Sequence, residues 1–301
     1  MTTATARALD CASIAAAIHD AAVTDVRAFK PGNVSAASPG HGMHAQDFVN
    51  SADAAAAVIA QPGLTIGERI LRAIEATREV VAFNTNLGIV LLCAPLAHAA
   101  VEPLAERNLR DRVAAGLRAL TVTDAELAYR AIRLARPGGL GHSERHDVSD
   151  APSVSLLEAM REAAGRDRIA YQYVTDFRDV FESGVPAART ALASGYSAEW
   201  AAVAVYLVFL SRFPDSHVGR KHGPEIAREV IREAQTAATA LEAAAGPQQA
   251  MPLLEDLDRR LKSRDINPGT SADMTVASLV AAALEDSLDR RYHAGAVSTG
   301  T

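Results

Sequence analysis

The sequence predicts an all-α fold, a single compact domain built from many helices. Hydrophobic residues make up 49% of the 301 positions, alanine is very abundant, and aromatic residues account for only 5%. This composition favours closely packed helices. Strictly alternating runs of β-branched residues, which would indicate strands, are missing from the sequence.

Periodicity and start signals place the helices along the chain. In the segment 123–135, Leu127 and Ile132 fall on one side, and Asp124 follows threonines that can cap a helix. In 250–263, leucines recur at helical spacing with charged residues between them. The predicted helices are 6–28, 45–60, 66–82, 86–104, 108–119, 123–135, 153–164, 175–193, 197–211, 224–245, 250–263 and 271–291.

No internal repeat or low-complexity linker divides the chain. Residues 1–292 are therefore predicted to form one helical domain, and 293–301, HAGAVSTGT, a flexible C-terminal tail. The alanine-rich segment 224–245 could pack against a second copy, so a homodimer is possible, although burial within one chain explains it equally well.

Charge and cysteine content exclude several classes of protein. The net charge is −6, and no dense basic run suggests a nucleic-acid partner. No signal peptide and no membrane span are expected, because about 18 uncharged apolar residues in a row are missing. Cys11 and Cys93 lie far apart, which indicates a reduced compartment. The expectation is a cytoplasmic protein.

Polar residues are concentrated in six segments between or at the starts of the helices. Each combines Gly or Pro with Asn, Asp, Glu, His, Lys or Arg, and each leads towards a helix N-terminus, where free N–H groups favour anions. These polar segments are KPGNVS (30–35), GERI (67–70), FNTNLG (83–88), PGGLGHSERHDVSD (137–150), FPDSHVGRKHG (213–223) and INPGTSAD (266–273).

Considered one at a time, each polar segment is typical of a turn followed by a helix cap. Taken together, they supply cations for phosphate, amides for orientation, and carboxylates for a hard metal such as Mg²⁺. This combination indicates a nucleotide site without a Walker loop or a GxGxxG sequence. His142 and His146 stand four apart, but their loop context argues against zinc, and His98 fits an apolar core. Glu68 suits a helix start and a metal site equally well.

In their order along the chain, the polar segments resemble the triphosphoribosyl-dephospho-CoA synthase family. The likeness spans roughly residues 30–285 and rests on KPGNVS, GERI, NTNLG followed by APL, PGGLG with DV, DSH with RKHG, and NPGTSAD followed by ASL. It implies an all-helical cytoplasmic transferase, which moves the triphosphoribosyl group of ATP to the ribose 2′-hydroxyl of 3′-dephospho-CoA and releases adenine. Asn86 and the DSH sequence depart from the family pattern and indicate a divergent branch.

The implied chemistry assigns roles to these residues. Breaking an N-glycosidic bond passes through an oxocarbenium-like state, so the site must hold triphosphate, move protons and exclude water. The residues expected to bind the nucleotide are Lys30, Gly32, Asn33, Asn84, Thr85, Asn86, Arg220, Lys221, Gly269 and Ser271. The expected Mg²⁺ ligands are Glu68, Asp147, Asp215 and Asp273, and the expected catalytic residues are Asp147, Asp215 and His217.

Three other functions fit the same residues. One is ATP-dependent ribosyl transfer to a different acceptor, such as a pterin cofactor. Another is a helical Mg²⁺-dependent hydrolase, in which water replaces the acceptor. The third is a non-enzymatic helical scaffold, whose polar segments are only caps and which would gain no stability from Mg²⁺ and ATP.

Overall fold

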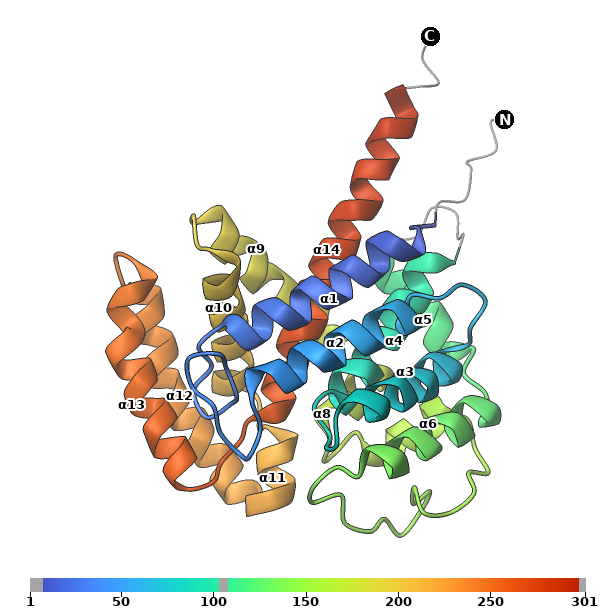
Figure 1. Ribbon diagram of the computed structural model, residues 1–301, viewed down its shortest axis with the longest axis horizontal. Helices are drawn as coiled ribbons and strands as arrows, with labels where there is room; N and C mark the ends of the chain where they lie inside the picture. The colour runs from blue at the N-terminus through green and yellow to red at the C-terminus, as the bar shows by residue number, and fades with distance from the viewer. Residues whose placement is uncertain (1–7, 103–107, 298–301) are drawn as a thin grey trace.

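The computed structural model describes residues 8–102 and 108–297, and every regular element in them is helical (Figure 1). The first half contains α1 (Cys11–Arg27), α2 (Ala45–Ile59), α3 (Ile66–Val80), α4 (Leu87–Val101), α5 (Leu109–Arg118), α6 (Val122–Ala135), α7 (Leu156–Ala163) and α8 (Arg168–Val174). The second half contains a π-helix (Val180–Gly184), α9 (Val185–Ala193), α10 (Ala198–Arg212), α11 (Ser216–His222), α12 (Pro224–Ala243), a 3₁₀ turn (Pro247–Ala250), α13 (Met251–Ser263) and α14 (Gly269–Val297). The all-α prediction is confirmed.

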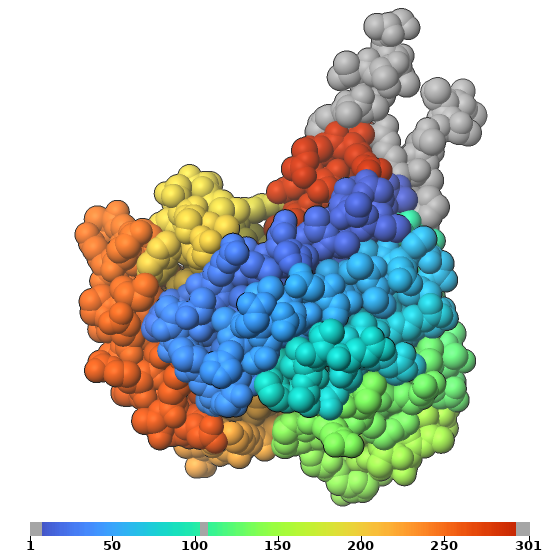
Figure 2. Space-filling model, in the orientation of Figure 1, coloured from blue at the N-terminus to red at the C-terminus, as the bar shows by residue number. Residues whose placement is uncertain are grey.

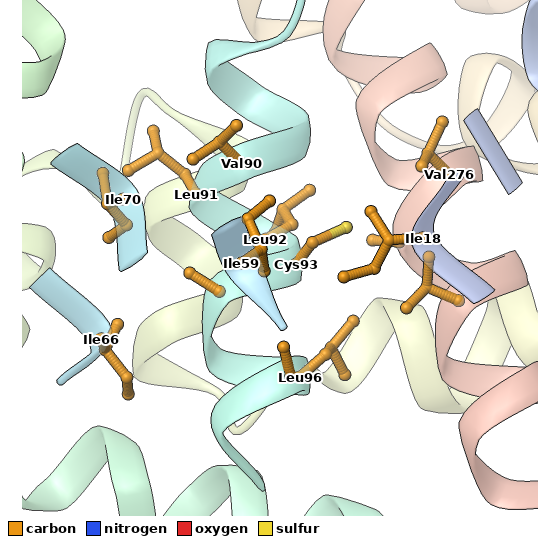
Figure 3. Close-up of a cluster of buried hydrophobic side chains, with 14 of the residues drawn as sticks. Ile18, Ile59, Ile66, Ile70, Val90, Leu91, Leu92, Cys93, Leu96 and Val276 are labelled. Carbon is orange, nitrogen blue, oxygen red and sulfur yellow. The ribbon is translucent and has the colours of Figure 1, made fainter. Parts of the chain in front are cut away.

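Helix α4 forms the centre of the larger hydrophobic core. It is apolar on all sides, as expected of a helix with neighbours all round. Figure 3 shows Leu92, Cys93 and Leu96 of α4 among side chains from the surrounding helices, including Ile18 of α1 and Ile59 of α2. Because this core holds α4 fixed, the polar segment at its N-terminus has a defined position.

A second, smaller core lies between α10, α12 and α13. Helix α14 joins the two cores, because it packs against α1 and α4 on one side and against α10 on the other. In the space-filling view, α1 and α2 run as neighbouring bands across the face between the two parts (Figure 2). The N-terminal end of α14 consequently lies where the two cores meet.

The structure corrects two predictions of local structure. The predicted helix 175–193 is observed as a continuous helical run over 178–193, but this run contains a π-helix before α9, and α8, which begins at Arg168, was not predicted. Pro186 has no N–H to donate, so it fits the first turn of α9 better than the interior of a long helix. Residues 216–222, expected to be part of a loop, form the short helix α11, which Asp215 caps.

The C-terminal helix is longer than predicted. α14 continues through Val297 and so overlaps the predicted tail 293–301, whose last four residues lie outside the described part of the chain. No helix in the described ranges is long and apolar enough to cross a membrane.

Candidate active site

A cleft of about 240 Å³ opens between α4, α6, α7 and α8 on one side and the N-terminal ends of α11 and α14 on the other. Four of the six polar segments contribute to its lining. They supply Asn84 and Gly88 from FNTNLG, His142 to Asp147 from PGGLGHSERHDVSD, His217 and Arg220 from FPDSHVGRKHG, and Thr270 and Asp273 from INPGTSAD. Segments far apart in the sequence therefore meet at one place.

Asp273 places a carboxylate in the cleft beside the start of α4. It lies near the N-terminal end of α14, and a Cβ at Gly88 would fall only 2.0 Å from its Oδ2 atom, so only glycine leaves room for it. Its side chain makes no hydrogen bond to residues 8–102 or 108–297. Burial raises the pKa of Asp273 well above the ordinary value, and the nearby charges of Asp215 and Asp25 raise it further. A cationic group in the cleft would therefore stabilise the ionised form.

His217 faces the same cleft from α11. Its imidazole packs against the first residue of α14, because a Cβ at Gly269 would lie 2.7 Å from Nδ1. Burial lowers the pKa of His217 below its ordinary value, and the charges of Arg220 and Lys221 lower it further, while Asp215 opposes them. The ring is thus neutral at pH 7 and can accept a proton.

Asp215 joins two helix N-termini and has no oxygen left for a ligand. Its Oδ1 atom accepts hydrogen bonds from the backbone N–H groups of His217 (2.9 Å) and Val218 (3.1 Å). Its Oδ2 atom accepts from the backbone N–H (2.7 Å) and the hydroxyl (2.8 Å) of Ser271. The geometry makes Asp215 and Ser271 structural, in contrast to the predicted catalytic and metal roles of Asp215 and the predicted nucleotide contact of Ser271.

Asp147 organises the loop that forms one wall of the cleft. Its carboxylate accepts hydrogen bonds from the backbone N–H of Ser143 (2.6 Å) and from the N–H (2.9 Å) and hydroxyl (2.6 Å) of Ser149, and it lies 3.0 Å from His142 Nδ1. These hydrogen bonds, led by the Ser149 hydroxyl, hold the pKa of Asp147 well below its usual range. A carboxylate with a lowered pKa is a weak base, and its hydrogen bonds to Ser143 and Ser149 hold the loop in shape.

The KPGNVS segment lies outside the cleft. Lys30 is 1% exposed and forms an ion pair with buried Asp25, whose pKa burial raises despite this partner. The N–H of Gly32 donates to Asp258 Oδ1 (2.8 Å), and Asn33 Nδ2 donates to Asn267 Oδ1 (2.8 Å). The Lys30 ammonium, the Gly32 N–H and the Asn33 amide thus all have partners in the protein interior. We therefore do not assign any of them to binding of the triphosphate.

The three polar residues before α4 have three different roles. Asn84 lies at the edge of the cleft, two residues before the N-cap Asn86, and its Oδ1 atom accepts the N–H of Leu87, the first residue of α4 (3.0 Å). The hydroxyl of Thr85 bonds that of Ser51 (2.5 Å), and Asn86 Nδ2 donates to Thr77 Oγ1 (2.9 Å). Only Asn84 lines the cleft, whereas Thr85 and Asn86 fasten this segment to α2 and α3.

The predicted metal ligands do not form a cluster. Glu68 is in a capping box, in which its carboxylate accepts the N–H of Thr65 (2.8 Å), and it lies outside the cleft. Among the described residues, no group of three or more His, Cys, Asp or Glu side chains is placed to hold a metal ion. Asp273 is the one predicted ligand whose carboxylate faces the cleft without a hydrogen bond in residues 8–102 and 108–297.

The cationic side chains at the cleft include one predicted residue, Arg220, and one that was not predicted, Arg166. Arg220 lines the cleft and pairs with Asp167, while Lys221 pairs with Asp265 (2.6 Å) away from it. Among the described residues, the Arg166 guanidinium donates only to uncharged acceptors, the carbonyl of Glu162 (3.2 Å) and the hydroxyl of Ser143. The cap residue Asp167 was the signal that a helix begins here and places Arg166 at its start.

With this geometry established, comparison with known proteins identifies the family. Residues 11–291 match the family described as ATP:dephospho-CoA triphosphoribosyl transferase. The chain belongs to this family. A search of curated proteins found no match. A crystal structure from Archaeoglobus fulgidus, assigned as a triphosphoribosyl-dephospho-CoA synthase, aligns with a TM-score of 0.60 at 24% identity, covering 78% of this chain and 97% of that one. At that identity it supports the fold.

The family assignment confirms the resemblance seen in the sequence. The protein is a transferase of the ATP:dephospho-CoA triphosphoribosyl transferase family, and its reaction moves the triphosphoribosyl group of ATP to dephospho-CoA. Because ATP consists of adenine joined to this group, adenine is the leaving group. The bond that breaks in this reaction is therefore the one at the ribose carbon C1′.

Proposed function

We propose that the transfer takes place in the cleft between α4, α8, α11 and α14, with Asp273 and His217 as the two groups that act on the substrates. The observation that supports this proposal is that both side chains face one cleft while neither is engaged in a hydrogen bond within the described residues. Free titratable groups with shifted pKa values in a cleft are typical of active sites.

In this proposal His217 is the general base. The C1′–N9 bond of ATP breaks and its electron pair leaves with adenine, while the acceptor hydroxyl oxygen forms the new bond to C1′. The hydroxyl proton passes to the neutral imidazole of His217, and the departing adenine takes one proton from water. His217 then returns its proton to water, so the protons balance and the base is regenerated. A positioned general base contributes roughly 10²–10⁴ in rate.

Asp273 has the complementary role of stabilising positive charge. The ribosyl carbon becomes cation-like in the transition state, and a carboxylate fixed beside it in a water-poor cleft stabilises that charge. The developing cation also favours ionisation of Asp273, which counteracts the burial that raises its pKa.

The triphosphate is proposed to lie against Arg166 and Arg220. Arg166 has no carboxylate partner among the described residues, and the Nε atom of Arg220 is buried without a hydrogen bond, so both have donors to spare. We also propose that Mg²⁺ binds with ATP, since Mg²⁺ commonly uses one or two protein carboxylates together with substrate phosphates. Asp273 fits the single-carboxylate case, and the metal would neutralise phosphate charge.

The cellular and oligomeric expectations remain proposals. Cys93 is buried and Cys11 is half-buried, and both are free thiols, which suits the reducing cytoplasm. The homodimer stays a prediction, and sedimentation velocity would test it.

An adenine-release assay tests the proposed function. Purified protein is incubated with ATP and Mg²⁺, with and without dephospho-CoA, and free adenine is quantified by chromatography. We expect release only when the acceptor is present, and its loss in Asp273→Asn and His217→Gln. Asp150→Asn and His19→Gln are the matched controls at exposed positions outside the cleft. Release at equal rate without acceptor would instead indicate a hydrolase, and full activity of both cleft variants would refute the assignment.

A further inference from the structure

The cleft has a polar end and an apolar end, and the two meet at Gly88. A Cβ at Gly88 would lie 2.0 Å from Asp273 Oδ2 and 2.8 Å from Ile169 Cδ1, so the carboxylate and the apolar wall approach the same point. We call the apolar end the base lobe. It is lined by Leu87, Leu91, Ile132, Leu156, Met160 and Ile169.

Asn84 provides a free hydrogen-bond donor at the edge of the cleft. Its Oδ1 atom is occupied by the N–H of Leu87 (3.0 Å), which fixes the orientation of the amide. Its Nδ2 group donates to no atom of the described residues, although the residue is partly buried and lines the cleft. A fixed amide N–H without a partner, next to an apolar surface, is suited to one specific acceptor on a mostly apolar ligand.

We infer that the base lobe and the Asn84 amide bind the adenine of ATP as the leaving group, an inference that rests on the proposed function. Adenine is bonded directly to C1′, the carbon that must lie beside Asp273. The lobe adjoining Asp273 is therefore filled by the group attached to that carbon. Phosphates fit this place poorly, because the six residues that define the lobe are all apolar and none of them compensates the desolvation of a phosphate.

The amide also assists bond cleavage. As the C1′–N9 bond breaks, its electron pair moves into the purine and raises the negative charge on the ring nitrogens. A hydrogen bond from Asn84 Nδ2 to one of these nitrogens becomes stronger in the transition state than in the ground state, which lowers the barrier. The same lobe excludes water from the cation-like carbon.

Asn84→Asp separates recognition of the base from the hydrogen bond to α4. Aspartate keeps an oxygen in the position that accepts the Leu87 N–H, so this bond at the start of α4 is kept while the amide donor is replaced by an acceptor. The deciding readout is the inhibition constant of free adenine, because adenine has no phosphate that the new charge could repel. We expect it to rise about tenfold, in line with the loss of one hydrogen bond and its replacement by repulsion.

Asn108→Asp is the matched control for this variant. Asn108 is the N-cap of α5, and its Oδ1 atom, like that of Asn84, accepts the N–H of the residue three positions ahead, here Asp111 (2.9 Å); Asn108 lies outside the cleft. We expect unchanged adenine inhibition in Asn108→Asp and an unchanged circular dichroism spectrum in both variants. Equal adenine inhibition in wild type and Asn84→Asp would overturn the role of the amide.

Enlarging the lobe tests its occupant by a gain of activity. Met160→Ala removes most of a side chain that lines the lobe, and the space created should admit N6-benzyl-ATP as donor. We expect the kcat/KM ratio of N6-benzyl-ATP to ATP to rise at least tenfold in Met160→Ala and to stay constant in Met251→Ala, on α13 outside the cleft. A changed KM for dephospho-CoA alone would assign the lobe to the acceptor and overturn the inference. That result would leave the proposed function intact, because acceptor-dependent adenine release by wild type, and its loss in Asp273→Asn and His217→Gln, test that function separately.

Discussion

Replacing Asp215 by asparagine should destabilise the protein, because this carboxylate ties α11 to α14. Asparagine keeps one acceptor oxygen and puts an NH₂ group where the other oxygen was, so either the α11 cap or the pair of bonds to Ser271 is lost. Hydrogen bonds to a charged group contribute about 1.5–3 kcal/mol each, and the two bonds lost share one oxygen. The expected loss is therefore about 2–4 kcal/mol in the free energy of unfolding.

Urea denaturation followed by circular dichroism measures this loss, and Ser271→Ala provides the matched comparison. The alanine variant removes only the hydroxyl contact, so it should cost about 1–2 kcal/mol. Because the two residues touch, the double variant should cost less than the sum of the single variants. If Asp215→Asn keeps wild-type stability and loses adenine release, Asp215 takes part in the chemistry and its assignment as a cross-link is wrong.

Four further predictions separate structural residues from reacting ones. Asp273→Asn should abolish adenine release yet raise the free energy of unfolding at pH 8. The folded-state pKa of Asp273 is raised, so wild type loses stability as pH rises through that pKa. The difference in urea midpoint between wild type and Asp273→Asn should therefore vanish below pH 4, where this carboxyl is protonated in both the folded and the unfolded state. Lys30→Met should cost about 3–5 kcal/mol, because it leaves Asp25 buried without its counter-charge, and Asp25→Leu in the same chain should restore much of the midpoint. Glu68→Ala should lower stability by about 0.5–1 kcal/mol through the lost capping box while Mg²⁺-dependent adenine release is kept, whereas loss of that dependence would return Glu68 to the metal site. Because the pKa of His217 is lowered, the acid limb of the kcat/KM profile should have its midpoint below pH 6.5, and a midpoint above pH 6.5 would contradict a buried base with a lowered pKa.

The sequence was sufficient for the fold class, and the structure shows why. Alanine-rich periodic segments became helices wherever a capping residue preceded them, as at Asp10 and Thr121. The two helices that periodicity did not predict are α8 and α11, because each has only seven residues and is too short for a periodic pattern. Such short helices depend on a single cap and on tertiary packing.

The site was predictable in its segments but less so in its individual residues. Four of the six polar segments line the cleft, because motifs that interrupt apolar helices with Gly and polar side chains gather where helices end. The sequence does not distinguish a carboxylate that faces a cleft from one that accepts hydrogen bonds from backbone amides. Asp273 and Asp215 are 58 residues apart, and each lies in a polar segment at the start of a helix. Gly88 leaves space beside the Asp273 carboxylate, whereas the Asp215 carboxylate accepts a hydrogen bond from Ser271.

Hydrogen–deuterium exchange with and without ATP and Mg²⁺ tests the location of the active site most directly. Our account predicts that the ligand slows exchange at 84–91, 163–170 and 269–273, which border the cleft, while 30–35 and 66–70 change little. Slowed exchange at 30–35 and 66–70, with the cleft segments unchanged, would place the nucleotide elsewhere and contradict the account.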